Sequence, residues 1–297
     1  MRAVVAVLGP TGVGKTRVAA RIAEALGGHV LVADSRQVYR ELDIATNKPQ
    51  PEETRGVPFH LTDLVGPSET FNAHLWVRAA LALLEELDPR GVLPVIEGGT
   101  ALWVDALLDG FSLAGVPPDA DRRAALEDLS TAELADLVRK LDSEAELDFR
   151  NRRRLVRAIE TLEALGPPLA AARRRTPPDW KVVRVGLQLP PARLDEVLRE
   201  RSRRQVARGL VEETRAALEA GVPPEAPVLT GTGYVEAQAY LRGELSEAEL
   251  PERMAISNRQ LARRQLRWLR RDDRIAWFEA EPDPLPAILD HIRSRLS

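Results

Sequence analysis

The sequence predicts an α/β fold, in which helices flank a parallel sheet and an all-helical domain is inserted into the chain. Two observations support this prediction. Short apolar runs alternate with helical patterns in the first part of the chain, which is typical of parallel strands joined by right-handed crossovers. The middle of the chain has helical patterns only, between proline-marked borders, and an apolar run then returns to the sheet. We therefore expect a core at 1–114 and 180–297, interrupted by a helical insertion at 115–179.

The first strand is expected at Ala3–Leu8, a short valine-rich run typical of a buried parallel strand. A glycine-rich loop, GPTGVGKT from Gly9 to Thr16, follows it. From Arg17 onward apolar residues recur at helical spacing until the pair Gly27–Gly28, which stops the helix. Strand, loop and helix thus succeed one another as in a phosphate-binding P-loop, and the loop fits that pattern.

The loop has the groups that a phosphate site needs. Backbone N–H groups and the positive end of the helix dipole point at an anion bound there. Lys15 adds positive charge, and the Thr16 hydroxyl can hold Mg²⁺. A plain glycine turn between strand and helix is the alternative, but the fit of both flanks favours the phosphate site.

The next elements bring further polar residues to the same edge of the sheet. We expect a second strand at His29–Ser35, a helix within Leu64–Leu87, a third strand at Gly91–Thr100 and a helix at Ala101–Gly110. Proteins with an open parallel sheet bind their ligands at the carboxyl ends of the strands. The segments that should share this rim are Gly9–Thr16, Asp34–Gln37 and Gly98–Thr100.

The later elements complete the insertion and the core. Helices of the insertion are expected at Ala120–Leu129, Thr131–Leu141 and Asn151–Leu165. The core resumes with a strand at Lys181–Leu189, helices at Arg193–Ala207, Leu210–Ala220 and Glu247–Arg271, a short strand at Arg274–Phe278 and a last helix. The sequence contains no tandem repeat and no low-complexity tail, so a repeat architecture is excluded.

Composition excludes several classes of protein. No stretch of the 297 residues approaches the ~20 apolar residues of a membrane span, so no membrane association is expected. The chain runs from Met1 directly into the first strand, which leaves no room for a signal peptide and predicts a cytoplasmic protein. The absence of cysteine excludes disulfides and thiolate-bound zinc, and four scattered histidines argue against a histidine metal site. Any metal should be a hard cation at the phosphate.

Basic residues are concentrated locally although the net charge is −3. Almost all of them are arginines, since lysine occurs only at positions 15, 48, 140 and 181. The arginine clusters lie at Arg150–Arg157, Arg173–Arg175, Arg199–Arg204 and Asn258–Arg271. Local basic stripes on a mildly acidic chain suit a nucleic-acid groove. Each cluster taken alone is equally compatible with a solvated helix face.

A P-loop by itself suggests a kinase or an NTPase, which normally has an aspartate at the end of a hydrophobic strand to hold Mg²⁺. Glu97 is the nearest equivalent in this sequence. Asp34, at the end of the second strand, can act as a general base because a carboxylate at a strand tip is exposed to a ligand on the rim. The alternative role of Asp34 is that of a turn or N-cap residue.

Six motifs together resemble the bacterial tRNA dimethylallyltransferases, also called tRNA isopentenyltransferases. They are GPTGVGKT, DSRQVYRELDIATNKP, GGTALWVDALLDG, NRRRLVRAIE, GTGY and NRQLARRQLRWLRR, in the family's order and approximate spacing from Gly9 to about Trp277. The P-loop is common to many proteins, but the combination is specific. The resemblance implies a P-loop NTPase-like fold and transfer of a dimethylallyl group from dimethylallyl diphosphate to the exocyclic N6 amine of the adenine at tRNA position 37, beside the anticodon.

The resemblance also implies the roles of residues in the core. Asp34 would take the proton of the amine, and Thr100 would lie near the oxygen that joins the dimethylallyl and diphosphate groups. Arg201 would bind the diphosphate, although the family arginine can also be aligned with the neighbouring Arg203 or Arg204. Mg²⁺ would bind at Thr16. The diphosphate-binding set is Gly9, Pro10, Thr11, Gly12, Val13, Gly14, Lys15, Thr16 and Arg201. Thr16 and Thr100 have the alternative role of helix-capping hydroxyls.

By the same resemblance, the insertion would clamp the anticodon stem-loop of tRNA, with arginines on phosphates. The target base must be swung out of its loop to reach Asp34. The tRNA-contacting positions implied are Asp34, Ser35, Arg36, Gln37, Arg123, Arg153, Arg154, Leu155, Val156, Arg157, and the Thr230–Tyr234 turn with Gly233 and Tyr234. The family usually acts as a monomer, which we expect here as well.

Two residues depart from the family pattern. Glu97 stands where a small or aliphatic residue is expected, and Trp103 replaces a more usual tyrosine, so metal placement and the fit of the prenyl tail are affected. Three other readings remain: a prenyltransferase for free adenine nucleotides, a small-molecule P-loop kinase, and an RNA-binding protein without turnover. The large basic insertion argues against the first, and the pairing of Asp34 with Thr100 argues against the last.

Overall fold

The structure is a computed structural model that describes residues 2–111, 116, 119–173 and 175–297. The chain forms two compact units. The first comprises Met1–Val104 and Asp179–Ser297, and the second comprises Asp105–Pro178. The second unit therefore begins within the helix at Ala101–Leu108, ahead of the boundary expected at residue 115.

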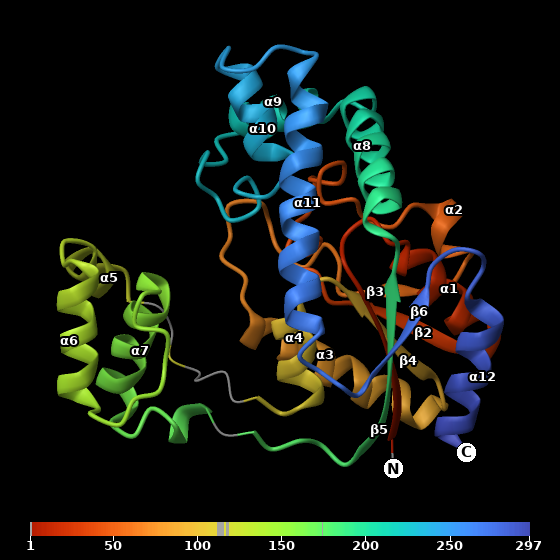
Figure 1. Cartoon of the computed structure of the whole chain (residues 1–297), viewed down its shortest axis with the longest axis horizontal. Helices are drawn as coiled ribbons and strands as arrows, with labels where there is room; N and C mark the ends of the chain where they lie inside the picture. The colour runs from red at the N-terminus through yellow and green to blue at the C-terminus, as the bar shows by residue number, and fades with distance from the viewer. Residues whose placement is uncertain (1, 112–115, 117–118, 174) are drawn as a thin grey trace. The chain divides into compact units, whose positions relative to one another are not determined.

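The first unit contains the expected parallel sheet (Figure 1). Its strands are β1 (Arg2–Leu8), β2 (Gly28–Val32), β3 (Phe59–His60), β4 (Leu93–Gly98), β5 (Trp180–Gln188) and β6 (Ile275–Glu279), in the spatial order β3-β2-β4-β1-β5-β6. All five pairings are parallel. The expected α/β class is confirmed. The short strand β3 was not expected, and β2 ends at Val32, so Asp34–Gln37 belong to the loop that follows it.

Helices of the first unit lie against this sheet and beyond the carboxyl ends of its strands (Figure 1). They are α1 (Lys15–Leu26), α2 (Pro51–Thr54), α3 (Ala73–Leu87), α8 (Pro191–Ala207), α9 (Leu210–Glu219), α10 (Tyr234–Leu241), α11 (Glu249–Leu269) and α12 (Leu285–Leu296), with α4 (Ala101–Leu108) at the junction of the units. A buried cluster including Val5, Ile22, Val95 and Ile288 joins α1 and α12 to the central strands. The α1 apolar face explains why its residues form a helix against the sheet.

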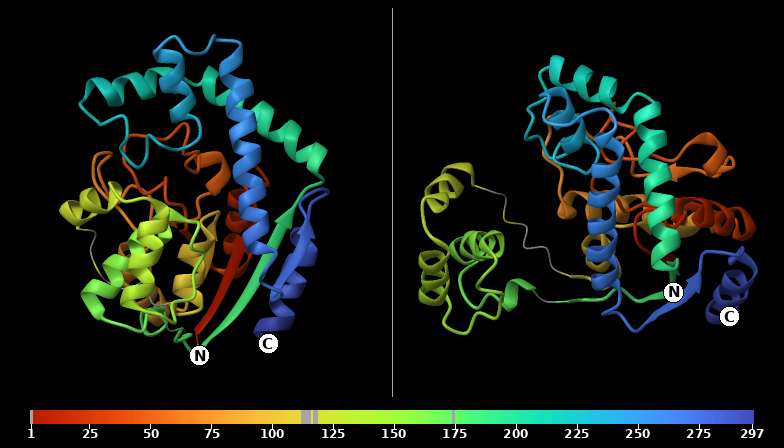
Figure 2. Two further views of the ribbon diagram at one scale, coloured as in Figure 1. Left: turned by 60° about the vertical axis from the view of Figure 1, so that its left-hand side comes forward. Right: turned by 45° about the horizontal axis from the view of Figure 1, so that its top comes forward.

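Two long helices stand beyond the carboxyl end of β5. The views in Figures 1 and 2 show α8 and α11 side by side. They pack through Leu194 and Leu198 of α8 and Ala262 of α11, all buried. This pair positions the arginine-rich sequences of both helices next to the sheet edge where the P-loop lies.

Trp103 of α4, the residue that departs from the family pattern, belongs to the core of the first unit. Its side chain is buried, and its ring stacks on Trp76 with centroids 5.5 Å apart and contacts Phe71 at 5.9 Å. The Trp76 indole N–H donates a hydrogen bond to the Val32 carbonyl oxygen, which ties this aromatic group to the end of β2. Trp103 is therefore a packing residue in this structure.

The second unit is helical, as expected, with α5 (Ala120–Glu127), α6 (Thr131–Leu141) and α7 (Arg152–Leu165). Its core includes Leu134, Val138, Leu155 and Ile159, which recur at helical spacing on α6 and α7. A capping box at Ser130 starts α6, because the Ser130 and Glu133 side chains each bond the other's backbone N–H. Two 3₁₀ turns, η1 (Asp88–Arg90) and η2 (Ala171–Arg173), complete the secondary structure of the described residues.

Among the helices of the described residues, none combines the length and hydropathy that a bilayer span requires.

Candidate active site

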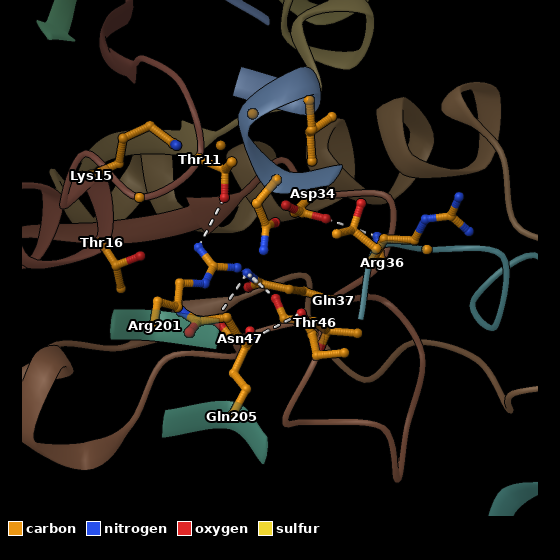
Figure 3. Close-up of a pocket in the computed structure, with 18 of the residues that line it drawn as sticks. Thr11, Lys15, Thr16, Asp34, Arg36, Gln37, Thr46, Asn47, Arg201 and Gln205 are labelled. Atoms are coloured by element: carbon orange, nitrogen blue, oxygen red, sulfur yellow. Dashed lines mark hydrogen bonds between the residues drawn. The ribbon is translucent and has the colours of Figure 1, made fainter. Parts of the chain in front are cut away.

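A cavity of about 870 Å³ lies in the first unit, at the carboxyl ends of the central strands. It is lined by the P-loop, by the loop after β2, by the turn after β4, and by residues of α8 and α11. Expected site residues that line it are Thr11, Gly12, Gly14, Lys15, Thr16, Asp34, Ser35, Arg36, Gln37, Thr100, Arg201 and Tyr234. Of these residues, Figure 3 labels Thr11, Lys15, Thr16, Asp34, Arg36, Gln37 and Arg201. The three segments expected to share one rim are thus brought together.

The P-loop joins β1 to α1 in a backbone conformation that requires glycine. Gly12 and Gly14 have φ angles of 85° and 86°, in the left-handed region that other residues rarely adopt. A Cβ atom on Gly12 would also lie only 2.6 Å from Cδ2 of Leu198. The Lys15 ammonium folds back over the loop and donates a hydrogen bond of 2.8 Å to the Pro10 carbonyl oxygen. Burial lowers the pKa of Lys15.

Two side chains from distant helices hold Thr11 at the tip of the P-loop. The Arg201 guanidinium of α8 donates a hydrogen bond of 2.8 Å to the Thr11 hydroxyl. The Gln265 side chain of α11 accepts a bond from the Thr11 backbone N–H at 2.8 Å and donates one to the Gly99 carbonyl oxygen at 3.0 Å. Sequence reasoning selected Arg201 but missed Gln265, although the repeated arginine–glutamine pairs of α11 were visible. Arg203 instead pairs with Glu252 at 2.9 Å.

Asp34 and Thr100 lie together where β2 and β4 end. Asp34 Oδ1 accepts a hydrogen bond of 2.8 Å from the Arg36 backbone N–H, which fixes the loop, while Oδ2 has no partner among the described residues. The Thr100 hydroxyl accepts a bond of 3.1 Å from the Ser35 backbone N–H. Gly98 allows this approach, because a Cβ atom there would lie 2.2 Å from the Ala33 carbonyl oxygen. The cavity therefore combines a phosphate cradle with a carboxylate that has a free oxygen.

Glu97 stands behind the P-loop at the end of β4. Its side chain is 3% exposed, and its Oε1 accepts a hydrogen bond of 3.3 Å from the Thr16 hydroxyl. Burial raises the pKa of Glu97 to about 7, although the nearby positive charge of Lys15 opposes this effect. In the described part of the chain, no group of three or more histidine, aspartate or glutamate side chains could hold a metal ion by itself.

A braced loop over 43–48 forms one wall of the cavity. The Gln37 amide donates to the carbonyl oxygens of Thr46 and Asn47, at 3.2 and 3.3 Å. Gln205 of α8 donates to the carbonyl oxygen of Ile44 at 2.8 Å, and Glu213 of α9 accepts from backbone N–H groups of the same loop. Gln37, expected to contact tRNA, therefore supports the cavity wall in this structure. Gln205 and Glu213 were missed, because nothing local in the sequence links them to this loop.

The Thr230–Tyr234 turn contacts the Asp34–Gln37 loop. The Arg36 guanidinium donates a hydrogen bond of 3.4 Å to the Thr230 hydroxyl. Tyr234 is 1% exposed, and its hydroxyl donates to Glu213 at 2.6 Å, so that group is engaged within the protein. Gly233 has a φ of 98°, and a Cβ atom there would meet Ala45 at 2.8 Å. The turn is followed by α10, which was not expected.

The remaining expected tRNA contacts lie in the second unit and none lines the cavity. Arg153 and Arg154 are exposed on α7, and Val156 is half-buried. Leu155 is fully buried in the helical core, so its side chain is not accessible to a ligand.

Two further expected contacts, Arg123 and Arg157, share one buried partner. Both guanidiniums donate hydrogen bonds to the Glu160 carboxylate, at 2.7 and 3.2 Å. Burial opposes ionisation of Glu160, but these bonds hold its pKa below the usual value. Both arginines remain about two-fifths exposed, at 44% and 41%. Neighbouring Arg152 is structural, because it donates to backbone carbonyl oxygens at the end of α5.

A parallel sheet whose P-loop shares one cavity with the Asp34 carboxylate defines a protein of the P-loop α/β class. Comparison with known proteins specifies the class further. The model of the IPP transferase family matches residues 37–272, and that of the isopentenyl transferases matches residues 2–64. The chain belongs to the IPP transferase family.

Relatives of this family cover nearly the whole chain. A tRNA dimethylallyltransferase of Thermomicrobium roseum is 40% identical over 99% of this chain and 90% of its own length. One from Roseiflexus sp. is 36% identical over 95% of this chain and 94% of its own. The full-length tRNA isopentenylpyrophosphate transferase of Bacillus halodurans has a similar structure, with a TM-score of 0.76 and 32% identity over 100% of this chain and 97% of that one. The expected P-loop NTPase-like fold is thereby confirmed.

Proposed function

We propose that this protein transfers a dimethylallyl group from dimethylallyl diphosphate to the exocyclic N6 amine of the adenine at position 37 of tRNA. Family membership supports the reaction class. The observation that carries the assignment to this site is the shared cavity, in which Asp34 and the P-loop face one another across space large enough for a prenyl diphosphate and a base. A volume of about 870 Å³ lies within the range of small-molecule sites.

The acceptor requires a base. The lone pair of an adenine amine is delocalised into the ring, so the amine gains nucleophilicity when its proton is removed as the new bond forms. In the proposed step, N6 forms a bond to C1 of the dimethylallyl group, the bond from C1 to the bridging oxygen breaks, and diphosphate leaves with both electrons. Asp34 Oδ2, which has no partner among the described residues, would receive the proton, and the Thr100 hydroxyl would lie beside the bridging oxygen.

The leaving diphosphate gathers negative charge, and the P-loop supplies groups to stabilise it. The backbone N–H groups, Lys15 and Arg201 would bind the diphosphate oxygens and stabilise their negative charge as it develops. Thr16 and Glu97 supply hard oxygen donors 3.3 Å apart, which fit a magnesium ion. When bound there, Mg²⁺ would add further neutralisation of the leaving group.

Binding of tRNA would involve both units. The Asp34–Arg36 loop and the Thr230–Thr232 turn border the cavity and would contact the swung-out base and its neighbours. The exposed Arg153 and Arg154 would bind phosphates of the anticodon stem. A monomeric state and a cytoplasmic location complete this proposal.

The test is a transfer assay with isotope-labelled dimethylallyl diphosphate and an anticodon stem-loop that carries adenine at position 37. We expect label in the RNA, located on that adenine by mass spectrometry of the nucleosides. A stem-loop with guanine at position 37 and free AMP are the matched controls, and both should remain unlabelled. Transfer to AMP, or phosphorylation of a small molecule with ATP in place of the diphosphate, would contradict the proposal.

A further inference from the structure

Glu97 occupies a special position relative to the P-loop. It lies on β4, the strand hydrogen-bonded directly beside β1, and is in register with Val7, the last residue but one of β1. The P-loop begins where β1 ends, so Glu97 lies on the strand next to the start of the P-loop. In P-loop NTPases, the corresponding strand end carries the aspartate that helps to hold Mg²⁺. In this chain, a glutamate stands near that strand end, one residue before the last of β4.

Among the described residues, no cation contacts Glu97 directly. Its side chain is 3% exposed, and its hydrogen bond comes from a neutral hydroxyl, that of Thr16. Within the described ranges, no lysine or arginine nitrogen lies within 4.0 Å of its oxygens, and the nearby Lys15 ammonium bonds to Pro10. Burying a carboxylate without a cation partner is costly. The carboxylate is therefore buried beside the expected metal residue with no cation of the described residues in direct contact, while the Lys15 charge nearby favours its ionised form.

We propose that Glu97 and Thr16 together form the protein half of a divalent-cation site, which the diphosphate completes. This inference rests on the proposed function, because diphosphate oxygens supply the remaining ligands. Mg²⁺ suits such a site, since it keeps several waters and usually takes one or two carboxylates together with substrate phosphates. In this chain, the cation would therefore be bound by the negative charge of Glu97 as well as by that of the diphosphate.

A purely structural role for Glu97 makes a different prediction. If its task were only to accept the Thr16 hydrogen bond, then glutamine would replace it, because its amide oxygen is an acceptor in the same place. If its task is to hold a cation, then glutamine fails, because the charge is lost. The substitution Glu97→Gln therefore separates the two roles.

The experiment measures Mn²⁺ binding by electron paramagnetic resonance, with inorganic pyrophosphate present and without RNA or prenyl substrate. We expect Glu97→Gln to weaken Mn²⁺ binding by about 10- to 100-fold, the range found when groups that support a metal are removed. Glu97→Val, which removes both the charge and the hydrogen-bond acceptor, should show the same loss. Glu52→Gln removes an exposed carboxylate from the same cavity and should leave Mn²⁺ affinity unchanged. Circular dichroism verifies that each variant is folded.

The outcomes separate this inference from the proposed function. Equal Mn²⁺ affinity in the parent protein and Glu97→Gln, with pyrophosphate binding intact, would overturn the cation site and leave the transfer reaction standing. Failure of the parent protein to bind pyrophosphate at all would overturn both. If Glu52→Gln weakened Mn²⁺ binding as much as Glu97→Gln does, the loss would reflect a general charge effect, and this result would also overturn the site.

Discussion

The Arg201 side chain illustrates how one residue connects distant parts of the chain at the P-loop. It lies 190 residues from Thr11 in sequence, yet its guanidinium bonds to the Thr11 hydroxyl, and its buried Nε has no partner among the described residues. A half-buried guanidinium whose Nε is unpaired among the described residues, placed at a phosphate cradle, is suited to an anion. This orientation distinguishes Arg201 from Arg203, which pairs with Glu252 at the surface.

Replacing Arg201 by alanine should weaken pyrophosphate binding by about 10- to 100-fold, because hydrogen bonds to charged groups contribute roughly 1.5–3 kcal/mol. Isothermal titration calorimetry with inorganic pyrophosphate checks this. The matched control is Arg203→Ala on the same helix, which should bind pyrophosphate as the parent does. If the two variants lost affinity equally, Arg201 would have no special place at the diphosphate.

Motif residues could be predicted from the sequence, whereas their supports could not. Lys15, Thr16 and Asp34 follow from local pattern, since each stands in a loop directly after a strand. Gln265 depends on a contact across 254 residues with Thr11, and Gln205 on one across 161 residues with Ile44. Such contacts arise from the packing of helices on the sheet, which periodicity does not encode. Tyr234 shows the converse, because a residue of a recognised motif is buried and bonded to Glu213.

At the scale of elements, α11 links two of the loops that make the cavity. Its Gln265 joins the P-loop at Thr11 to the turn after β4 at Gly99, and the helix packs along α8, which carries Arg201. The relative position of the diphosphate cradle and the Thr100 turn thus depends on one side chain of a C-terminal helix. Displacement of this helix would loosen both loops together.

Gln265→Ala should weaken pyrophosphate binding by about fivefold, since a neutral hydrogen bond contributes roughly 1 kcal/mol. The free energy of unfolding, measured by urea denaturation, should fall by ~1–2 kcal/mol for the same reason. Gln260→Ala, at an exposed position of the same helix, is the control and should alter neither quantity. Unchanged pyrophosphate affinity in Gln265→Ala would refute the link between the two loops.

Long, strongly patterned elements were predicted well, and short ones were missed. The strands β1, β4 and β5 and the helices α3, α6 and α7 lie close to their expected ranges. The elements α2 and β3 span four and two residues, too few for a periodic signal to develop. The helix α10 begins at Tyr234, the last residue of the expected Thr230–Tyr234 turn.

At the scale of the whole molecule, the chain forms a sheet-based unit that holds the cavity and a helical unit with exposed arginines. The sequence predicted the parallel sheet and the helical insertion. It did not predict the strand order, which depends on long-range pairing, or that the helical unit begins at Asp105. Of the arginines in that unit, Arg123, Arg152 and Arg157 bond within the protein, whereas Arg153 and Arg154 are exposed.

The double variant Arg153→Ala, Arg154→Ala should bind an anticodon stem-loop more weakly and with a flatter dependence on salt. Each lost phosphate contact reduces the slope of log K against log salt by about one unit. Fluorescence anisotropy at several salt concentrations measures both quantities. Arg139→Ala, Lys140→Ala removes the same charge from the exposed face of α6 and should retain the parent slope. An unchanged slope in the first variant would make Arg153 and Arg154 ordinary solvated residues.

In the proposed mechanism, Asp34 removes a proton from the adenine amine in the cavity that also holds the diphosphate. The most direct measurement is the single-turnover rate of dimethylallyl transfer to the stem-loop by Asp34→Asn, with both substrates saturating. We predict a rate about 10²- to 10⁴-fold below that of the parent, as expected for loss of a general base, with the affinity for the stem-loop and for pyrophosphate retained. A rate close to that of the parent protein would contradict the assignment of Asp34 and, with it, the mechanism proposed for this site.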